Sequence, residues 1–303
     1  MRIAFFGLPL AALLLRHDGH DVVYAGICRR GALGTRRLRR RIGPERVHVL
    51  PDTQDPALPG RLRALGPDLL VSWFWVKNLP PVIRAVAPLG TVGVHPSLLP
   101  RHRGPDPYFW TLASGDAVAG VTAHRLDDAY DTGAMLGQRE ISVQPTWNSW
   151  TLAKALDRPS LALLRQTCAA FAKGTPPRET PQDERQATLA PSPSDEELEI
   201  DWDQPTEQVL ARIRAAAPWP GAYTFLGDEA VVITRAEPAS KVLAALSPGE
   251  GAVTQSHGHT RAVVRTQDGA VALLEGRIDD DEADLPLGPM DLVDLMAKAR
   301  TDL

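Results

Sequence analysis

Short apolar segments alternate with helix-like segments through the first 95 residues. The apolar runs cover residues 2–6, 22–28, 47–50, 68–72 and 90–94, and the helical patterns between them cover 9–18, 56–65 and 80–87. This alternation predicts a parallel sheet with helices on both faces. Ligands of such sheets bind at the carboxyl ends of the strands. His95 directly follows the last of these runs, so we expect it at the functional edge.

The middle of the chain predicts two more strands, a long helix and a linker. Residues 118–126 and 134–143 are strand candidates around a polar loop, and 150–171 is a helical pattern that Pro159 is expected to kink or break. Five prolines in residues 174–197 are typical of an interdomain linker.

Beyond residue 205 the pattern changes to one helix followed by short strands. The helix covers 206–216, the strand candidates are 223–226, 231–236, 261–266 and 270–275, and a closing helix covers 289–300. Asp268-Gly269 is a tight-hairpin signal. Short strands at this spacing predict a small β-barrel.

Composition argues against several classes of protein. Cys28 and Cys168, the two cysteines, show no CxxC spacing, so neither a disulfide scaffold nor a metal site is expected, and a reducing compartment fits. No run of 18 apolar residues predicts a membrane span. The first 23 residues favour a strand, a turn and a helix over a signal peptide, which predicts a cytoplasmic protein.

One series of motifs carries a family resemblance. Residues 93–104 read GVHPSLLPRHRG, and GVTAH at 120–124 and DTG at 131–133 follow in order. The series resembles the folate-dependent formyltransferases. Their hallmark is Asn-x-His-x-Ser-Leu-Leu-Pro-x-x-x-Gly, then a Gly-Val-Thr strand and an Asp-Thr-Gly loop.

The resemblance extends over nearly the whole chain and is closest to methionyl-tRNA formyltransferase-like proteins. Residues 2–7, 182–188, 200–202 and 217–224 carry it further. It implies an α/β fold with a Rossmann-like formyltransferase domain at 1–178, a linker at 179–204 and an OB-like β-barrel domain at 205–303.

The resemblance also implies a reaction, in which an amine takes the formyl group of 10-formyltetrahydrofolate. A tetrahedral oxyanion forms, and each placed donor that meets it is worth roughly 3–4 kcal/mol. The attacking nitrogen must lose a proton to a base. In the family an Asn and a His are the donors and an Asp is the partner of the His. By position, the His is His95 and the Asp is Asp131.

The chain departs from the family at Gly93, which occupies the position of the Asn. His124 or Asn78 would replace the lost donor, or His95 would act with water and a slower turnover. A further alternative is lost or altered chemistry, either a folate-binding protein or a formyl-folate hydrolase. A complete loss of the donor would slow the step about 100- to 1000-fold.

A second segment resembles the family's pterin pocket. One wall would hold the apolar and aromatic residues Trp73, Phe74, Trp75, Val76 and Leu79, and the other Leu126, Asp127, Asp128 and Tyr130. Flat aromatic side chains suit a heteroaromatic ring. The alternative is that these side chains are plain core.

Two charge patterns point to different formyl acceptors. Residues 1–50 hold ten Arg against three acidic residues, with Arg36, Arg37, Arg39, Arg40 and Arg41 clustered, whereas residues 205–303 hold nine Lys and Arg against fifteen Asp and Glu. The cluster would meet tRNA phosphates, or form a solvated helix face. The acidic run at 279–282 would repel them. We expect a small-molecule amine as the acceptor, with methionyl-tRNA as the alternative.

Overall fold

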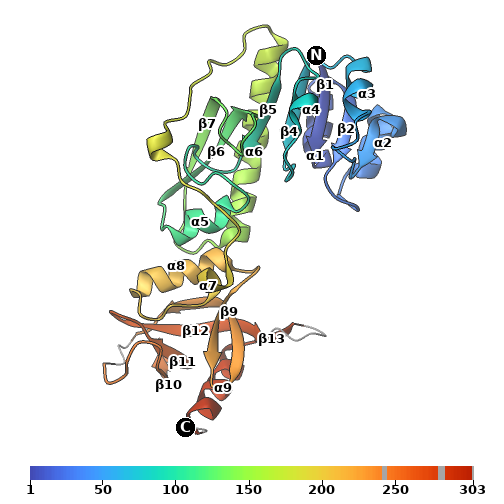
Figure 1. Cartoon of the computed structure of the whole chain (residues 1–303). Helices are drawn as coiled ribbons and strands as arrows, with labels where there is room; N and C mark the ends of the chain where they lie inside the picture. The colour runs from blue at the N-terminus through green and yellow to red at the C-terminus, as the bar shows by residue number, and fades with distance from the viewer. Residues whose placement is uncertain (241–243, 279–283, 302–303) are drawn as a thin grey trace. The chain divides into compact units, whose positions relative to one another are not determined.

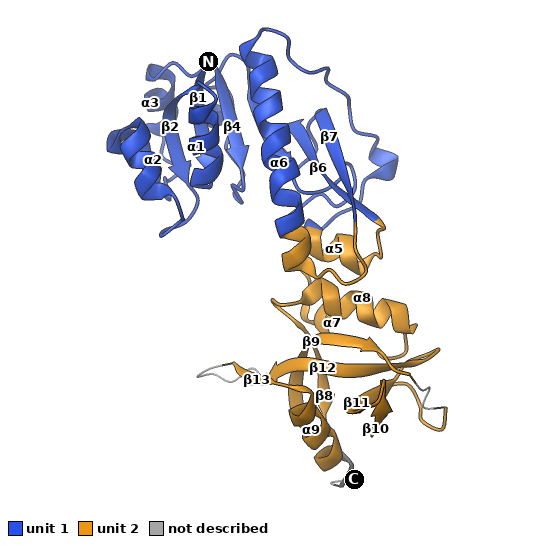
Figure 2. Ribbon diagram, turned by 180° about the vertical axis from the view of Figure 1, so that it is seen from behind, with its two compact units in different colours: residues 1–107, 118–142, 154–191 blue, residues 108–117, 143–153, 192–303 orange. Residues whose placement is uncertain are grey.

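The computed structural model describes residues 1–240, 244–278 and 284–301. Two compact units divide the chain, as Figure 2 shows: residues 1–107, 118–142 and 154–191 form unit 1, and the remaining residues form unit 2. These units interleave along the sequence. The domain boundaries expected after residues 178 and 204 stay a prediction.

Unit 1 is built on a sheet of seven strands within the described residues (Figure 1). They are β1 (Arg2–Gly7), β2 (Asp21–Ile27), β3 (Val47–Val49), β4 (Leu69–Trp73), β5 (Thr91–His95), β6 (Val118–Arg125) and β7 (Met135–Ser142). The order is β3-β2-β1-β4-β5-β6-β7. The first five pair in parallel, and β6 and β7 each pair antiparallel to their neighbour. The predicted Rossmann-like class is confirmed.

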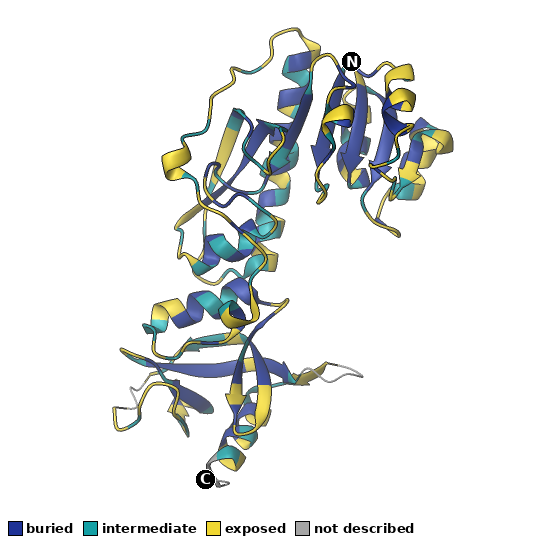
Figure 3. Cartoon of the chain, in the orientation of Figure 1, coloured by how far each residue is buried: buried dark blue, intermediate teal, exposed yellow. Residues whose placement is uncertain are grey.

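Helices connect the parallel strands. They are α1 (Pro9–His17), α2 (Thr35–Ile42), the 3-10 turn η1 (Pro44–Arg46), α3 (Leu58–Ala64) and α4 (Pro81–Arg84). Pro9 begins α1 in a position where its missing N–H is tolerated. Ala4, Phe6, Leu70 and other side chains form a buried cluster with residues of α3 and α4. Figure 3 shows the parallel strands as mostly buried, as expected for a sheet covered on both faces.

The helix after β7 corrects one prediction. α5 (Pro107–Ala113) precedes β6, and α6 (Ser149–Ala172) follows β7 as one helix that contains Pro159. The predicted break is wrong, whereas the alternative, a kink at Pro159, stays a prediction. Proline removes one backbone hydrogen bond. Leu156 and Leu163, on either side of it, are buried, and we attribute the continuity of the helix to this packing.

The strand order predicts where a ligand would bind. The chain moves from β1 outward to β2 and β3, then returns to β4 on the other side of β1 and continues to β5. Such a reversal is a switch point, where α/β sheets bind ligands outside the carboxyl ends of the strands. Trp73 and His95 are the last residues of β4 and β5. Both therefore lie at this edge.

Unit 2 contains an antiparallel sheet. Its strands are β8 (Ala222–Leu226), β9 (Glu229–Pro238), β10 (Gly251–Ser256), β11 (His259–Arg265), β12 (Ala270–Ile278) and β13 (Leu285–Leu287). The order is β10-β11-β12-β9-β8, with β13 on β12. The hairpin at Asp268-Gly269 is confirmed, since it joins β11 to β12. The sequence missed β10 and β13, and closure of the sheet into a barrel stays a prediction.

Further helical segments follow the long helix α6. They are η2 (Glu184–Gln186), α7 (Asp195–Leu198), α8 (Thr206–Ala216) and α9 (Pro289–Thr301). Ser194 caps α7 in a reciprocal arrangement with Glu197. Among the described residues no helix is both long and apolar enough to cross a membrane.

Candidate active site

The pairing of β5 with β6 gathers the predicted site residues. Gly93 is directly opposite His124, and His95 is directly opposite Thr122. Opposed residues of an antiparallel pair point to the same face, and so do residues two apart on one strand. The two histidines, 29 positions apart, therefore share one face of the sheet. Their rings lie edge to face with centroids 6.4 Å apart.

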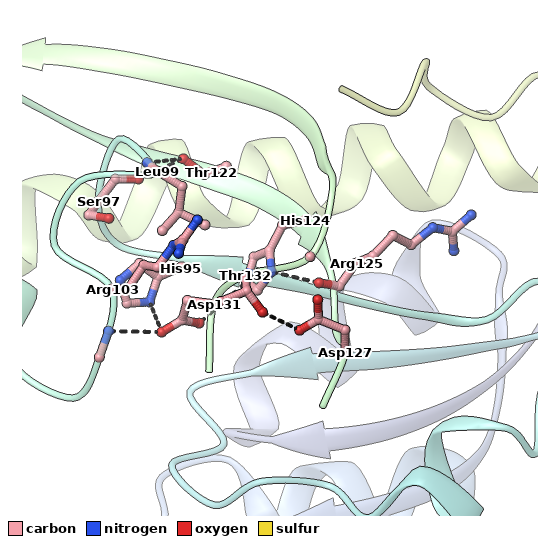
Figure 4. Close-up of polar contacts among 12 residues, drawn as sticks. His95, Ser97, Leu99, Arg103, Thr122, His124, Arg125, Asp127, Asp131 and Thr132 are labelled. Atoms are coloured by element: carbon pink, nitrogen blue, oxygen red, sulfur yellow. Dashed lines mark hydrogen bonds and ion pairs between the residues drawn. The ribbon is translucent and has the colours of Figure 1, made fainter. Parts of the chain in front are cut away.

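Asp131 places its carboxylate between the two imidazoles (Figure 4). Oδ2 is 3.4 Å from Nδ1 of His95, and Oδ1 is 3.6 Å from Nε2 of His124. The exposed fractions of these side chains are 17% for Asp131, 8% for His95 and 4% for His124. Electrostatic interactions are stronger at such buried positions than in water. The structure thus brings the sequence-predicted imidazole and carboxylate together, whereas their catalytic roles stay a prediction.

Backbone carbonyls fix the tautomer of each ring. Nε2 of His95 lies 2.8 Å from the carbonyl oxygen of His102, and Nδ1 of His124 lies 2.8 Å from that of Arg125. A carbonyl oxygen only accepts, so both of these nitrogens carry protons. The other nitrogen of each ring faces Asp131. The unprotonated nitrogen of a neutral ring would therefore face the carboxylate.

Burial favours the neutral form of the His124 imidazole. It lowers the pKa of His124, and the nearby His95 lowers it further, while the Asp131 carboxylate acts in the opposite direction. Because burial is the largest cause, His124 is the neutral imidazole near pH 7.

The Asp-Thr-Gly turn holds Asp131 in an uncommon conformation. Its φ is 58°, and its Oδ2 accepts a hydrogen bond of 3.0 Å from the N–H of Gly104. The Thr132 hydroxyl donates to Asp127 over 2.6 Å, which ties the turn to the preceding loop. A Cβ at Gly133 would lie 2.0 Å from the carbonyl oxygen of Arg125, so only glycine fits.

Thr122 is a site residue that the sequence analysis missed. Its hydroxyl donates to the carbonyl of Ser97 (2.7 Å) and accepts from the N–H of Leu99 (3.0 Å). These bonds hold the Ser-Leu-Leu-Pro loop against β6, opposite His95. The Gly-Val-Thr motif contained the signal, but the sequence did not show which group the hydroxyl would bind.

Gly93 leaves room that neighbouring side chains fill. A Cβ there would lie 2.7 Å from Cδ1 of Leu126 and 3.8 Å from Nε2 of His124. His124 is thus next to the space that the family's Asn would use. The other expected substitute, Asn78, donates its side-chain amide to the carbonyl of Asp128 over 3.1 Å. Of these two substitutes, His124 is the one that the described structure places beside Asp131.

The first expected wall of the pterin pocket, residues 73–76 and Leu79, contains both buried and accessible residues. Leu79 is fully buried, and Trp73 is 3% exposed and donates its indole N–H to Ser160 over 2.7 Å. Both side chains therefore fit the alternative that these residues belong to the hydrophobic core. Phe74 is half-buried with a φ of 56°, and Val76 is exposed.

Trp75 is the residue of this wall that suits a ligand best. Its ring packs edge-on against Phe6, with centroids 5.2 Å apart. Its indole N–H is buried, and no described residue accepts a hydrogen bond from it. A buried donor without a partner is rare in folded proteins, so a ligand acceptor would suit this position.

The second wall contacts the first at its outer end. Leu126 is half-buried against the same cluster as Trp75. The backbone N–H of Asn78 donates to the exposed Tyr130 hydroxyl over 3.1 Å, and Arg84 pairs with the Asp128 carboxylate. The loops after β4 and β6 are therefore joined to each other. In the described part of the chain, no group of three or more His, Cys, Asp and Glu could hold a metal.

Comparisons with known proteins agree with this architecture. Residues 46–167 match the formyl transferase family, and residues 193–283 match its C-terminal domain. A methionyl-tRNA formyltransferase of Chloroflexus aurantiacus is 33% identical over 290 residues, which cover 91% of each chain.

Solved structures share the fold at lower identity. HypX from Aquifex aeolicus, in complex with tetrahydrofolic acid, has a TM-score of 0.68 at 20% identity over 98% of this chain, which spans about half (48%) of that protein. A 4-N formyltransferase from Francisella tularensis has a TM-score of 0.59 at 17% identity, covering 73% of this chain and 91% of its own. The sequence matches to both domains, together with this fold, show that the chain belongs to the formyl transferase family of one-carbon group transferases.

Proposed function

We propose that this enzyme transfers the formyl group of 10-formyltetrahydrofolate to the amine nitrogen of a small molecule. The observation that carries the proposal is the Asp131 carboxylate between two buried imidazoles with fixed tautomers. Paired groups whose environments separate their protonation states are suited to acid and base work in one site.

The two histidines take different parts in the proposed reaction. His95, at the position of the family's catalytic His, would turn an N–H from its present partner to the formyl oxygen as the amine attacks the carbon and the oxyanion develops. His124, which is neutral, accepts a proton from the attacking nitrogen. The intermediate then collapses: its bond to N10 of the folate breaks, N10 takes the proton that His124 accepted, and the formamide leaves.

Two observations support a folate as the formyl donor. The indole N–H of Trp75 needs an acceptor, and a pterin ring carries several. Trp75 and Leu126 both pack against one core cluster, and Leu126 lies next to Gly93, so the two residues offer apolar surface to a flat ring. The structure of Aquifex HypX with tetrahydrofolic acid has the same fold.

Charge supports a small acceptor. The sequence from residue 205 onward has a net charge of −6, from nine basic and fifteen acidic residues. A negatively charged region repels the phosphates of a nucleic acid. The acidic run at 279–282, which contributes to this charge, lies outside the described residues.

Helix α2 favours a second candidate, formylation of methionyl-tRNA. Its five arginines are all exposed, while Leu38 and Ile42 are buried on the opposite side. No described residue forms an ion pair with any of these arginines, which leaves them available to phosphates. The Chloroflexus relative carries that function in its name.

Turnover of 10-formyltetrahydrofolate, followed by absorbance, tests the proposal. We expect the rate to depend on an added small amine from a panel of amino acids, amino sugars and polyamines. Dependence on charged methionyl-tRNA instead would select the second candidate. Equal rates without any acceptor would indicate hydrolysis, and binding without turnover would indicate a non-enzyme; either result would reject transfer.

A further inference from the structure

The side chain of Gln182 joins two turns of the candidate active site. Its amide nitrogen donates to the carbonyls of Asp131 (2.7 Å) and Gly133 (2.8 Å), and its oxygen accepts from Nε (3.0 Å) and Nη2 (2.8 Å) of Arg103. All four bonds have normal hydrogen-bond lengths. One amide therefore connects the turn that carries Asp131 to the loop that follows β5.

The loop at the other end of this connection supports His95. Arg103 directly follows His102, whose carbonyl oxygen lies 2.8 Å from Nε2 of His95. The next residue, Gly104, donates its N–H to the Asp131 carboxylate. A shift of the Gln182 amide would thus move Asp131 and the support of His95 relative to each other.

Both turns adopt a conformation that needs external support. The φ angles are 58° for Asp131 and 57° for His102. Non-glycine residues keep such angles only where the surroundings hold them. For His102, part of that support comes from the same segment as Gln182, because its N–H donates to the Thr188 hydroxyl over 2.8 Å. Residues 180–190, expected to be linker, thus hold both turns.

Charge fixes the orientation of the Gln182 amide. The Arg103 side chain is 6% exposed and pairs with Glu184 at 2.8 Å, which raises the pKa of Arg103 and keeps it cationic. A guanidinium only donates, so it requires the oxygen of the amide, not its nitrogen. The nitrogen must then face the carbonyls of Asp131 and Gly133.

We propose that Gln182 is a positioning residue, which sets the separation of the Asp131 carboxylate from His95. It acts through Arg103 and the Asp-Thr-Gly turn and does not contact the reacting atoms. Its effect on rate rests on the proposed function, whereas its effect on geometry does not.

The most informative variant is Gln182→Glu. It keeps the shape of the side chain and an oxygen for Arg103, but it replaces the N–H donor to the carbonyls of Asp131 and Gly133 by an acceptor. We expect kcat to fall by up to about 100-fold, as for a displacement of catalytic groups by an ångström, with KM for the folate nearly unchanged. Gln186→Glu is the matched control, because Gln186 is exposed in the same segment and its side chain bonds to Asp183.

A crystal structure of each variant separates this inference from the proposed function. In Gln182→Glu we expect a longer Oδ2 to Nδ1 distance between Asp131 and His95 than the 3.4 Å of the wild type, and no change in the control. If Gln182→Glu misfolds, Gln182→Leu provides the same comparison. An unchanged distance and an unchanged kcat would overturn the inference. An inactive wild type would reject the proposed function, and the distances would still decide the role of Gln182.

Discussion

Gly93 and His124 are direct partners across β5 and β6, and a Cβ at position 93 would lie 3.8 Å from the His124 ring nitrogen. The side chain that is missing at position 93 and the imidazole of His124 are therefore neighbours in the same part of the site. The site has a donor or acceptor at this place, but it comes from β6 and not from β5.

This arrangement predicts that Gly93→Asn does not raise the rate of formyl transfer. The new side chain would displace Leu126, whose Cδ1 is 2.7 Å from the Cβ position, and crowd His124. We expect a lower kcat, measured by folate turnover. Gly93→Ala separates the effect of the Cβ from that of the amide. A rate above wild type in Gly93→Asn would show that the site is an impaired version of the family's.

Removing the second imidazole tests its role directly. His124→Phe keeps a buried ring and removes both nitrogens, and we expect kcat to fall about 100- to 1000-fold, as for the loss of a placed polar group. His48→Phe is the control, since His48 stacks on Tyr24 and is exposed. Equal losses in the two variants would contradict a special role for His124.

The buried His124 also predicts a pH dependence of stability. Its pKa in the folded state is lowered, so the unfolded state binds more protons below the ordinary value of about 6.5. The wild type should lose stability as the pH falls through that value and change little above it. One titrating group changes the free energy of unfolding by at most about 1.4 kcal/mol per pH unit.

Urea unfolding of the wild type and of His124→Phe between pH 5 and 7.5 measures the contribution of His124 to this pH dependence. His20 and His48, whose pKa values burial also lowers, remain in both proteins and cancel in the comparison. We expect a flatter dependence in the variant. Identical curves would mean that Asp131 compensates fully for the burial of His124.

Trp75→Phe tests the proposed folate contact. Phenylalanine keeps a ring beside Phe6 but removes the buried N–H. We expect tetrahydrofolate to bind about 5-fold more weakly, since a hydrogen bond contributes about 1 kcal/mol. The free protein should be no less stable, because a buried donor without a partner costs about 1–3 kcal/mol. Calorimetric titration gives the affinity, and undiminished binding would place the folate elsewhere.

The arginines of α2 predict a salt dependence if a nucleic acid is the acceptor. Changing Arg37, Arg40 and Arg41 to Gln should reduce the slope of log affinity for tRNA against log salt by about 0.7–0.9 for each phosphate that an arginine no longer neutralises. Arg185→Gln is the control, because Arg185 is 90% exposed and paired with Asp183. Turnover with a small amine should not change.

Local sequence was sufficient for most of unit 1. The spacing of apolar runs predicted each of its parallel strands, because buried strands of a doubly covered sheet are continuous hydrophobic segments. The motif series also predicted the family correctly. The break at Pro159 was predicted wrongly, because a local rule for proline does not include the burial of the leucines around it.

By itself the sequence determined the strand–helix order, the family, and the chemical types at His95, Asp131 and Gly93. The tertiary structure decided which groups meet: His124 faces Asp131, Trp73 bonds to Ser160, and Gln182 connects two turns. The physical reason is that strand register and long-range hydrogen bonds join residues far apart in the chain, such as Trp73 and Ser160, which are 87 positions apart. Patterns of a few residues determine secondary structure, but they contain no record of such partners.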